Sequence, residues 1–530
     1  MSLLTSRLAA LNSTENQCHL SDIQRGIEKE SLRVTPAGAL ANTLHPKALG
    51  STLTHPSITT DFSESLLEFI TAPSASIDEV LGSLDDIHRF TYRHIGDELL
   101  WVNSMPCMLG RDQDIPLGQY GSSNIGQMKT IYRRGLGNRY GRLMQTIAGI
   151  HYNWSLPDAC WQVLQQDDNY SGSLQDFKTE RYFDLIRNFR RHFWLLLYLF
   201  GAAPAVCRSF VKDRAHRLQP MGEDDHSLHL PYATSLRMGD LGYQSSAQES
   251  LIVCYNNLPN YIENLRGALT TPYPAYEAVG VKEPGGKYRQ LSPHLLQIEN
   301  EFYSTIRPKR VTEGNETALE ALWQRGVEYI EVRCVDLNPY MPVGINAEQM
   351  RFLDVFLMHC LLQESPQTDN REYGQILNNQ RKIVERGREP GLSLSRGDGE
   401  TSLQEWAGEL FTQLQPIARA LDASHGDNAH SEAVSAMEQR LQHPELTPAA
   451  QLLEEVRSSD STYFQTALRH AEKHREFFLD SKLDPAVEEQ FVSLAAHSLE
   501  DQKAIEAADT LSFDDFLSAY YKQYQFSLES

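Results

Sequence analysis

The chain has 530 residues, of which 41% are apolar and 22% are charged, and both proportions are ordinary for a globular protein. They exclude a disordered, collagen-like or low-complexity chain. The 48 basic and 70 acidic side chains give a net charge of −22. A surface of that sign repels phosphate backbones, which argues against general nucleic-acid binding.

The N-terminal residues contain no basic stretch followed by an apolar run, so no secretory signal is expected. The longest apolar run, residues 194–200, is much shorter than the roughly 20 residues that span a bilayer. The seven cysteines are widely spaced, with no Cys-x-x-Cys pair, which argues against a zinc knuckle or a disulfide framework. We therefore expect a cytoplasmic protein with no membrane or nucleic-acid partner.

The hydrophobic pattern changes near residue 400. Before it, helical stretches such as 76–95 and 347–363 alternate with short strand-like runs. After it, amphipathic spacing with few glycines predicts helices at 402–422, 431–442, 447–458, 461–480 and 484–499. Residues 390–400 are rich in turn formers and predict a loop between the two regions. We expect a core over residues 1–400 and a helical region over 401–530 packed on it as one structural unit.

Four strand-like runs before residue 400 carry chemically reactive side chains: 24–30, 66–70, 149–154 and 329–334. In a strand, side chains i and i+2 share one face, and the apolar side chains of these runs alternate with polar ones. This pattern predicts antiparallel strands with one face on the core and one face wet. The wet face would carry Glu28, Glu30, Glu68, His151, Asn153, Glu331 and Arg333, with Asp61 just before the second run.

A fifth run, residues 296–303, predicts a strand with Gln297, Glu299, Glu301 and Tyr303 on one side. An ordinary solvated face is the simplest explanation for any one of these strands. Such a face usually mixes Lys, Thr, Ser and Glu, whereas here it offers mostly carboxylates with a His and an Arg. Crowded carboxylates repel one another unless a cation lies among them. Mg²⁺ takes carboxylates together with substrate phosphates, and a His suits Mn²⁺ better, so the pattern predicts a divalent-metal nucleotide site.

Signals for phosphate binding are weaker. Residues 121–130 look like a P-loop, but two residues separate the second Gly from Lys129, whereas the motif requires them adjacent. No Gly-x-Gly-x-x-Gly follows a strand, which disfavours a dinucleotide-binding site. Arg307, Lys309 and Arg310 form a basic cluster after the fifth run. Because Arg binds phosphate or carboxylate with two donors, this cluster is a candidate phosphate or nucleotide site, with a solvated loop as the alternative.

Several long segments are similar, in order, to the proteobacterial type of glutamate–cysteine ligase: 24–34, 59–70, 145–155, 231–237, 240–243, 296–303, 306–310 and 328–333. The match is collinear over about residues 20–345, and such long strings are far more specific than short motifs. The resemblance implies an α+β fold similar to that of glutamine synthetase. In that fold a curved antiparallel sheet forms a funnel, with helices outside.

The resemblance also implies an activity. The family joins the γ-carboxylate of L-glutamate to the amine of L-cysteine through a γ-glutamyl phosphate, with ATP as co-substrate, in the first step of glutathione biosynthesis. Carried over by matched motif, the Mg²⁺ ligands are Glu28, Glu30, Asp61, Glu68, His151 and Glu331. Glu28, Glu331 and Arg333 are the catalytic candidates, with Arg333 anchoring glutamate or the transferred phosphoryl group. The substrate-binding candidates that line the cysteine site are Tyr132, Gln145, Arg237, Tyr243 and Tyr303.

From the same resemblance we also expect feedback inhibition by glutathione and a monomeric state.

Three alternative functions stay open. A related ligase would join glutamate to ammonia or another amine. A metal-dependent hydrolase would turn over without ATP, because carboxylates with a His also suit metal-activated water. A sensor protein would keep the fold without the chemistry, although intact acidic positions in all four strands argue against it.

Overall fold

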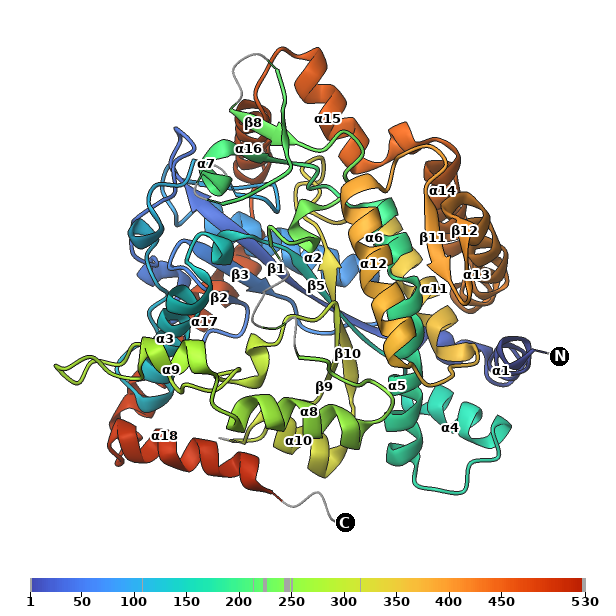
Figure 1. Ribbon diagram of the computed structural model, residues 1–530, viewed down its shortest axis with the longest axis horizontal. Coiled ribbons are helices and arrows are strands. Elements are labelled where there is room, and N and C mark those ends of the chain that lie inside the picture. Colours follow the sequence, from blue (N-terminus) through green and yellow to red (C-terminus); the bar gives the residue numbers. More distant parts are fainter. Residues whose placement is uncertain are drawn as a thin grey trace.

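The computed structural model describes residues 2–106, 108–212, 214–222, 226–242, 248, 251–314 and 316–526. Helices surround a central sheet (Figure 1), which agrees with the predicted α+β class. The sheet has seven strands in the order β2-β3-β1-β5-β10-β9, with β4 paired to β1, and all neighbours are antiparallel. Its edge strands are β2 and β9, so the sheet is open rather than closed into a barrel.

The strands of this sheet are β1 (Gln24–Val34), β2 (Ile58–Thr60), β3 (Leu66–Ile70), β4 (Leu99–Leu100), β5 (Ile150–Ser155), β9 (Ile306–Lys309) and β10 (Tyr329–Val335). The four runs predicted to carry the acidic face are β1, β3, β5 and β10, so these predictions are confirmed. Because β1 lies between β3 and β5, and β5 lies between β1 and β10, the four strands are contiguous in the sheet.

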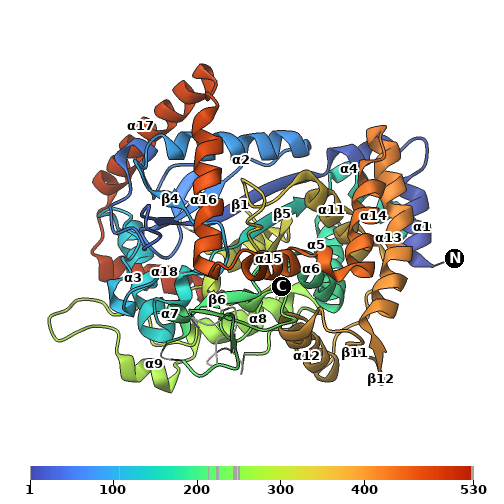
Figure 2. The same ribbon diagram turned by 90° about the horizontal axis from the view of Figure 1, so that it is seen from above.

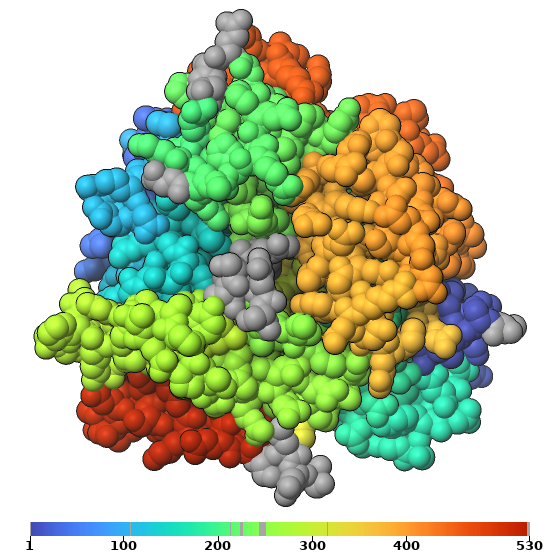
Figure 3. Space-filling model, in the orientation of Figure 1, coloured from blue at the N-terminus to red at the C-terminus, as the bar shows by residue number. Residues whose placement is uncertain are grey.

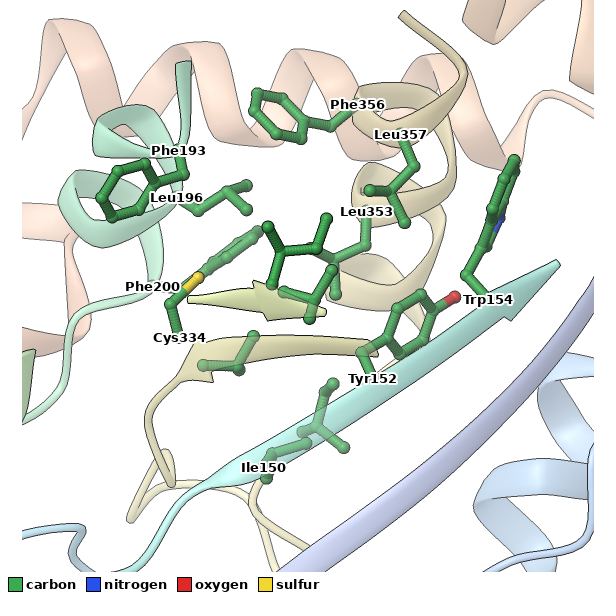
Figure 4. Close-up of a cluster of buried hydrophobic side chains, with 14 of the residues drawn as sticks. Ile150, Tyr152, Trp154, Phe193, Leu196, Phe200, Cys334, Leu353, Phe356 and Leu357 are labelled. Carbon is green, nitrogen blue, oxygen red and sulfur yellow. The ribbon is translucent and has the colours of Figure 1, made fainter. Parts of the chain in front are cut away.

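One face of the sheet is apolar, as the alternation requires. Ile150, Tyr152 and Trp154 of β5 and Cys334 of β10 are buried on it and point towards a set of helices (Figure 4). Those helices are α5 (Leu174–His192), α6 (Trp194–Phe200) and α11 (Ala347–Leu362). They contribute Leu196, Phe200, Leu353, Phe356 and Leu357 to the same cluster, together with Phe193, which lies between α5 and α6. The polar side chains of the four strands are therefore directed to the opposite face.

The predicted helix at 76–95 is α2 (Ile77–Tyr92), which begins after Ser76 because that side chain accepts a hydrogen bond from the N–H of Glu79. It packs against α16 (Tyr463–Asp480), as Figure 2 shows from above. The ring of His88 on α2 stacks on Phe478 of α16 at a centroid distance of 5.1 Å. This contact holds the C-terminal region against the sheet-covering helices.

All five helices predicted after residue 400 are confirmed; four have small shifts at their ends, and the last continues nine residues beyond its predicted end. They are α13 (Leu403–His425), α14 (Ala429–Gln442), α15 (Pro448–Ser458), α16 and α17 (Pro485–Ala508). A further helix, α18 (Phe513–Lys522), was not predicted. The loop predicted at 390–400 is partly a hairpin, since β11 (Ser393–Arg396) pairs with β12 (Gly399–Ser402). One buried apolar cluster extends from Leu11 to Tyr524, so both sides of residue 400 share a core.

The other elements lie around this framework. A small sheet joins β6 (Ala205–Cys207), β8 (Ser227–His229) and β7 (Gln219–Pro220). The remaining helices are α1 (Leu3–Leu11), α3 (Asn124–Tyr140), α4 (Asp158–Asp167), α7 (Arg208–Val211), α8 (Leu258–Thr270), α9 (Pro274–Val279), α10 (Ala318–Arg325) and α12 (Asn370–Arg386). Within the described ranges, no helix combines the length and apolarity needed to cross a membrane. Cys18, Cys160, Cys254, Cys334 and Cys360 are free thiols, and Cys207 is disulfide-bonded.

The prediction of a strand at 296–303 is wrong. The segment contains a 3-10 turn, η6 (Glu299–Glu301), and no strand. Its alternating carboxylates are buried because each one finds donors inside the protein. Glu299 accepts hydrogen bonds from the N–H groups of Ala318 and Leu319 at the start of α10. Buried carboxylates that bind backbone N–H groups produce the same sequence alternation as a wet strand face, which explains the error.

Candidate active site

The strand register brings the predicted acidic residues together. Across β1 and β5, Glu28 lies opposite His151, and across β1 and β3, Glu30 lies opposite Glu68. Across β5 and β10, Glu331 lies opposite Asn153. Directly opposed side chains in an antiparallel pair are neighbours on one face. Two groups of acidic residues result, and they lie side by side on the wet face of the sheet.

The first group consists of Glu28, His151 and Glu331. His151 Nδ1 lies 3.1 Å from Glu28 Oε2 and 3.7 Å from Glu331 Oε1. Asn153 Nδ2 donates to the other oxygen of Glu28 at 2.8 Å. One ligand atom from each of the three residues lies within 4.8 Å of the others. Two carboxylates and an imidazole form a donor set that fits a divalent cation of the Mg²⁺ or Mn²⁺ kind.

Cations of the protein surround Glu331. Arg333 Nη1 lies 3.1 Å from its Oε2, and Lys309 Nζ lies 3.5 Å from its Oε1. Burial by itself would raise the pKa of Glu331, but Lys309, Arg333 and His151 together lower the pKa well below its ordinary value. Burial likewise opposes ionisation of Glu28, and the hydrogen bond with His151 nevertheless brings the pKa of Glu28 below its usual range. Both carboxylates are therefore ionised at neutral pH.

The second group consists of Glu30, Asp61 and Glu68. Burial and the charge of Asp61 raise the pKa of Glu30, while burial, Asp61, Glu28 and Glu30 raise the pKa of Glu68 well above its ordinary value. Asp61 follows β2, and its side chain is 45% exposed. Three carboxylates so close together ionise readily when a cation lies among them. The raised pKa values show that these carboxylates repel one another, and a cation among them would reduce that repulsion.

A wall of aromatic and amide side chains borders the acidic face. Gln145 Nε2 donates to the hydroxyl of Tyr303 at 2.8 Å. The Tyr303 ring packs edge-on against Tyr140 of α3, with centroids 6.1 Å apart. Tyr132 lies on the same helix, where burial, Glu301 and Tyr303 raise its pKa well above the ordinary value. We call Tyr132, Tyr140, Gln145 and Tyr303 the acceptor wall.

Arg237 is buried beside the acidic face. Its Nη2 donates to the carbonyl of Arg333 at 2.8 Å, and its Nη1 lies 3.5 Å from Asp336. A Cβ atom at Gly149 would lie 2.0 Å from Arg237 Nη2, so only glycine leaves room for this guanidinium before β5. Tyr243, the remaining predicted substrate residue, lies outside the described residues.

The basic cluster after the fifth run divides between the two faces of the sheet. Lys309 reaches Glu331, as described above. Arg307 lies opposite Glu331 in the β9–β10 register and donates to the carbonyls of Asn300 and Phe302. Arg310 points the other way, where it lies 3.6 Å from Glu328. The structure therefore brings Lys309 and Arg307 to the acidic residues and places Arg310 elsewhere.

Sequence reasoning missed two cations of α3. Arg133 donates to the carbonyl of Asp61, and its guanidinium lies 4.3 Å from the centre of the Tyr120 ring. Lys129 Nζ lies 5.4 Å from the same ring, and burial lowers its pKa to about 8. Their i, i+4 spacing places both on one face of a helix, which was a usable signal. Lys129 belongs to the segment that resembles a P-loop, but it is presented by a helix.

A cavity of about 410 Å³ adjoins the acceptor wall. Its lining includes Tyr303, Thr305, Arg190, Tyr255, Tyr373 and Asn378. The carbonyl of Thr305 accepts a hydrogen bond from the N–H of Arg333, so the cavity lies close to the acidic face. In Figure 3, the orange atoms to the right of the centre include α12, and the yellow-green atoms below the centre belong to the segment after residue 250. The cavity has the size of a small-molecule site.

Comparison with known proteins identifies the family. The family model for glutamate-cysteine ligase matches residues 8–383. The glutamate–cysteine ligase of Alcanivorax borkumensis is 52% identical over 525 residues, which cover 98% of this chain and 100% of the relative. That of Saccharophagus degradans is 51% identical over 518 residues, covering 98% of both chains. The chain belongs to the glutamate–cysteine ligase family.

The crystal structure of the glutamate–cysteine ligase from Francisella tularensis in complex with AMP superposes with a TM-score of 0.89. It is 36% identical and covers 95% of this chain and 98% of its own. A bifunctional glutathione synthetase from Pasteurella multocida shares the fold, with a TM-score of 0.70 at 22% identity over 97% of this chain and 60% of its own.

Membership of the glutamate–cysteine ligase family gives the activity. The chain is an ATP-dependent ligase that forms γ-glutamylcysteine, the first step of glutathione biosynthesis. The family resemblance, the fold class and the predicted activity are thereby confirmed. The assignment favours the ligase over the hydrolase and the sensor protein, which the pattern of acidic residues had left open.

Proposed function

We propose that the ligation takes place on the acidic face of the sheet, with the residues of this chain in the following roles. The observation that carries the proposal is the strand register, which joins Glu28, His151 and Glu331 into one donor set beside Glu30, Asp61 and Glu68. Lys309 and Arg333 form ion pairs with Glu331 of this set.

The donor set of Glu28, His151 and Glu331 fits Mg²⁺, with Mn²⁺ as a second candidate because of His151, and Glu30, Asp61 and Glu68 are proposed as further ligands. When bound, a divalent ion would supply neutralisation of the nucleotide phosphates. Arg333 and Lys309 add fixed positive charge where negative charge develops during phosphoryl transfer. The Arg333 guanidinium has the two-pronged geometry that holds a carboxylate or a phosphoryl group, so it orients the γ-carboxylate of glutamate.

The chemistry proceeds in two steps. The γ-carboxylate oxygen attacks the γ-phosphorus of ATP, and the bond between phosphorus and the bridging oxygen breaks to leave ADP and γ-glutamyl phosphate. The neutral amine of cysteine then attacks the acyl carbon. The C–O bond to phosphate breaks, and the amine proton leaves with phosphate or to a nearby carboxylate. The acceptor wall excludes water, which would otherwise hydrolyse the acyl phosphate.

The cavity beside Tyr303 is our candidate for the adenosine part of ATP. Tyr255 and Tyr373 offer aromatic surface, and Asn378 offers an amide that can pair with a base edge. Arg190 lies over both rings, 4.6 Å and 5.0 Å from their centres. A nucleoside in this cavity would direct its phosphates past Thr305 towards Arg333 and the acidic face.

The direct test measures phosphate release with ATP, Mg²⁺ and glutamate, with and without cysteine, followed by mass analysis of the product. We expect release to require all four components and to yield γ-glutamylcysteine. Ammonia or another amine working better than cysteine would favour a different acceptor. Turnover in the absence of ATP would contradict the ligase mechanism and favour a hydrolase.

We also propose three properties that follow from the activity. ATP as co-substrate supports a cytoplasmic location. Glutathione contains the γ-glutamylcysteine unit, which supports feedback inhibition by binding at the same face. A monomer is the expected state, and light scattering on the purified chain tests it.

A further inference from the structure

The C-terminal end of the chain lies against the two elements that carry the acceptor wall. We call residues 506–526 the C-terminal strap; it includes α18 and the residues on either side of it. Its first contacts are with the N-terminus of α3, the helix that bears Tyr132 and Tyr140. Glu506 accepts a hydrogen bond from the N–H of Ser122 at 2.8 Å, and Asp509 accepts one from the N–H of Asn124.

The strap next contacts the segment 297–303, which ends in Tyr303. The Tyr521 hydroxyl donates to the carbonyl of Gln297 at 2.8 Å. The Tyr524 hydroxyl donates to the buried carboxylate of Glu299. That carboxylate also accepts from the start of α10, so it joins the strap, the segment and α10. Asp514 lies 2.7 Å from Lys282, which extends the same attachment to the neighbouring loop.

Between these attachments, Glu301 connects α3 to the segment. Its carboxylate is almost fully buried and accepts hydrogen bonds from Arg139 at 2.9 Å and from the Tyr140 hydroxyl at 2.8 Å. The backbone N–H of Gln297 donates to its other oxygen at 2.7 Å. Any displacement of residues 297–301 therefore moves Tyr140 and Tyr303 together, because both are tied to this carboxylate or to its chain neighbours.

We propose that the C-terminal strap positions the acceptor wall, with Tyr521 and Tyr524 as positioning residues for the amine acceptor. The inference rests on the proposed role of the acceptor wall in cysteine binding. Neither tyrosine lines the wall itself, and both act through the segment that ends in Tyr303. Four of the five carboxylates of the acidic face come from the central strands β1, β3 and β10, so loosening the strap leaves the geometry of these four in place. The strap thus affects the acceptor more than glutamate or ATP.

The test compares Tyr521→Phe, Tyr524→Phe and the double variant with the full-length wild type. Each change removes one hydroxyl and keeps the ring, so folding is preserved. Steady-state kinetics would be measured with cysteine, glutamate and ATP varied in turn, together with thermal unfolding. Tyr170→Phe is the matched control, because the Tyr170 hydroxyl donates to exposed Glu180 at 2.8 Å, outside the strap, the wall and the acidic face.

We expect each strap variant to raise KM for cysteine by about fivefold, because each variant loses one hydrogen bond. The double variant should raise KM for cysteine further. KM for glutamate and for ATP should change less than twofold, and Tyr170→Phe should match the wild type. A double variant with unchanged KM for cysteine would overturn the proposal. So would equal losses in all three KM values that follow the melting temperature, since those would show a purely structural role.

Tyr303→Phe separates the strap from the acceptor wall. If Tyr303→Phe raises KM for cysteine while the strap variants do not, the wall assignment stands and the strap proposal fails. If Tyr303→Phe has no effect on KM for cysteine, the assignment of the wall fails, and the strap proposal fails with it.

Discussion

At the scale of the residue, Glu331 shows how neighbouring side chains keep a buried carboxylate ionised. Its side chain is 1% exposed, and unpaired burial of a charge is costly. Arg333, Lys309 and His151 lie around it, so the ionised form is retained. In return, the ionised carboxylate gives Arg333 and Lys309 a buried counter-charge at 3.1 and 3.5 Å. The carboxylate is thus needed both for a bound cation and for the order of its basic neighbours.

We predict that Glu331→Gln and Glu28→Gln each lower ligation at least about a hundredfold, because both remove charge where a cation and the phosphoryl group are held. A coupled assay for ADP release measures this loss, and thermal unfolding checks that the fold is intact. Glu328→Gln is the control, since Glu328 lies near the start of the same strand on the other face, next to Arg310. Near-wild-type turnover in either site variant would refute the assignment of these residues.

At the scale of the element, helix α11 is attached to the sheet by a buried ion pair. Arg25 Nε of β1 donates to Asp354 Oδ2 at 2.8 Å, and neither side chain is exposed. The hydroxyl of Tyr152 on β5 donates to the other oxygen at 2.8 Å. These bonds fix α11 against two of the strands that carry Glu28 and His151 on the opposite face. The apolar face thereby sets the geometry of the wet one.

We expect Asp354→Ala to lower the free energy of unfolding by about 3–5 kcal/mol, because the Arg25 charge is left buried without its partner. Urea unfolding followed by circular dichroism measures this. Asp398→Ala removes an exposed partner of Arg371 and should change stability by less than about 1 kcal/mol. Equal losses in the free energy of unfolding for the two substitutions would show that the buried pair stabilises the fold no more than the exposed pair does.

Helix α11 also contacts α13 through a buried histidine. His359 Nε2 lies 2.7 Å from the amide oxygen of Gln413, which places the ring proton on Nε2. Burial lowers the pKa of His359 to about 4. The folded protein therefore binds this proton less readily than the unfolded chain, whose histidine titrates near 6.5. Stability conferred by the neutral ring is complete above pH 6.5 and is lost as the pH falls towards 4.

We predict that His359→Gln makes stability less sensitive to acid. Between pH 7 and pH 4.5 the wild type should lose up to about 3 kcal/mol more than the variant, at about 1.4 kcal/mol per unit of pKa difference. The measurement is urea unfolding at several pH values. Parallel pH profiles for the two proteins would show that His359 does not titrate in this way.

At the scale of the whole molecule, the surplus of acidic residues has two parts. Most of the 70 acidic side chains lie outside the acidic face, many of them on the helices after residue 400. There they contribute to solubility. The five acidic side chains of the acidic face, which are Glu28, Glu30, Asp61, Glu68 and Glu331, repel one another and so oppose folding, and this repulsion contributes to the raised pKa values of Glu30 and Glu68. A divalent cation would remove that repulsion.

We therefore expect Mg²⁺ to stabilise the protein in the absence of substrates, by about 2.7 kcal/mol when the free ion is at a hundred times its Kd. The gain should be larger at pH 8 than at pH 5.5, because protonated Glu30 and Glu68 compete with the ion. Thermal unfolding with and without Mg²⁺ tests this, with EDTA as the reversal. In Glu68→Gln the gain should shrink, and an unchanged gain would place the ion elsewhere.

The division into a core and a C-terminal region is also decided at this scale. We propose that residues 1–400 and 401–530 form one cooperative unit, since a single apolar cluster includes residues from both. Limited proteolysis in the hairpin of residues 393–402 tests this. A stable, active fragment ending there would contradict the proposal. The contacts of the C-terminal strap with α3 and residues 297–303 support it, because they join the two regions.

The sequence by itself determined the four strands and which side of each is wet, because side chains alternate with a period of two whatever lies around them. It therefore predicted Glu28, Glu30, Glu68, His151, Glu331 and Arg333 by parity, and the family resemblance added Asp61 and the acceptor residues. Helix periodicity located five of the C-terminal helices for the same local reason.

The tertiary structure alone decided which strands are neighbours, and thus that Glu28 meets His151 and Glu331. It also decided that Glu299 and Glu301 are buried in a turn, because their donors come from α10 and α3. Lys129 and Arg133 lie near Asp61 through the placement of α3, and the C-terminal strap contacts residues 297–303 from the far end of the chain. Such contacts depend on distant partners, and a local pattern contains no information about which partner will be near.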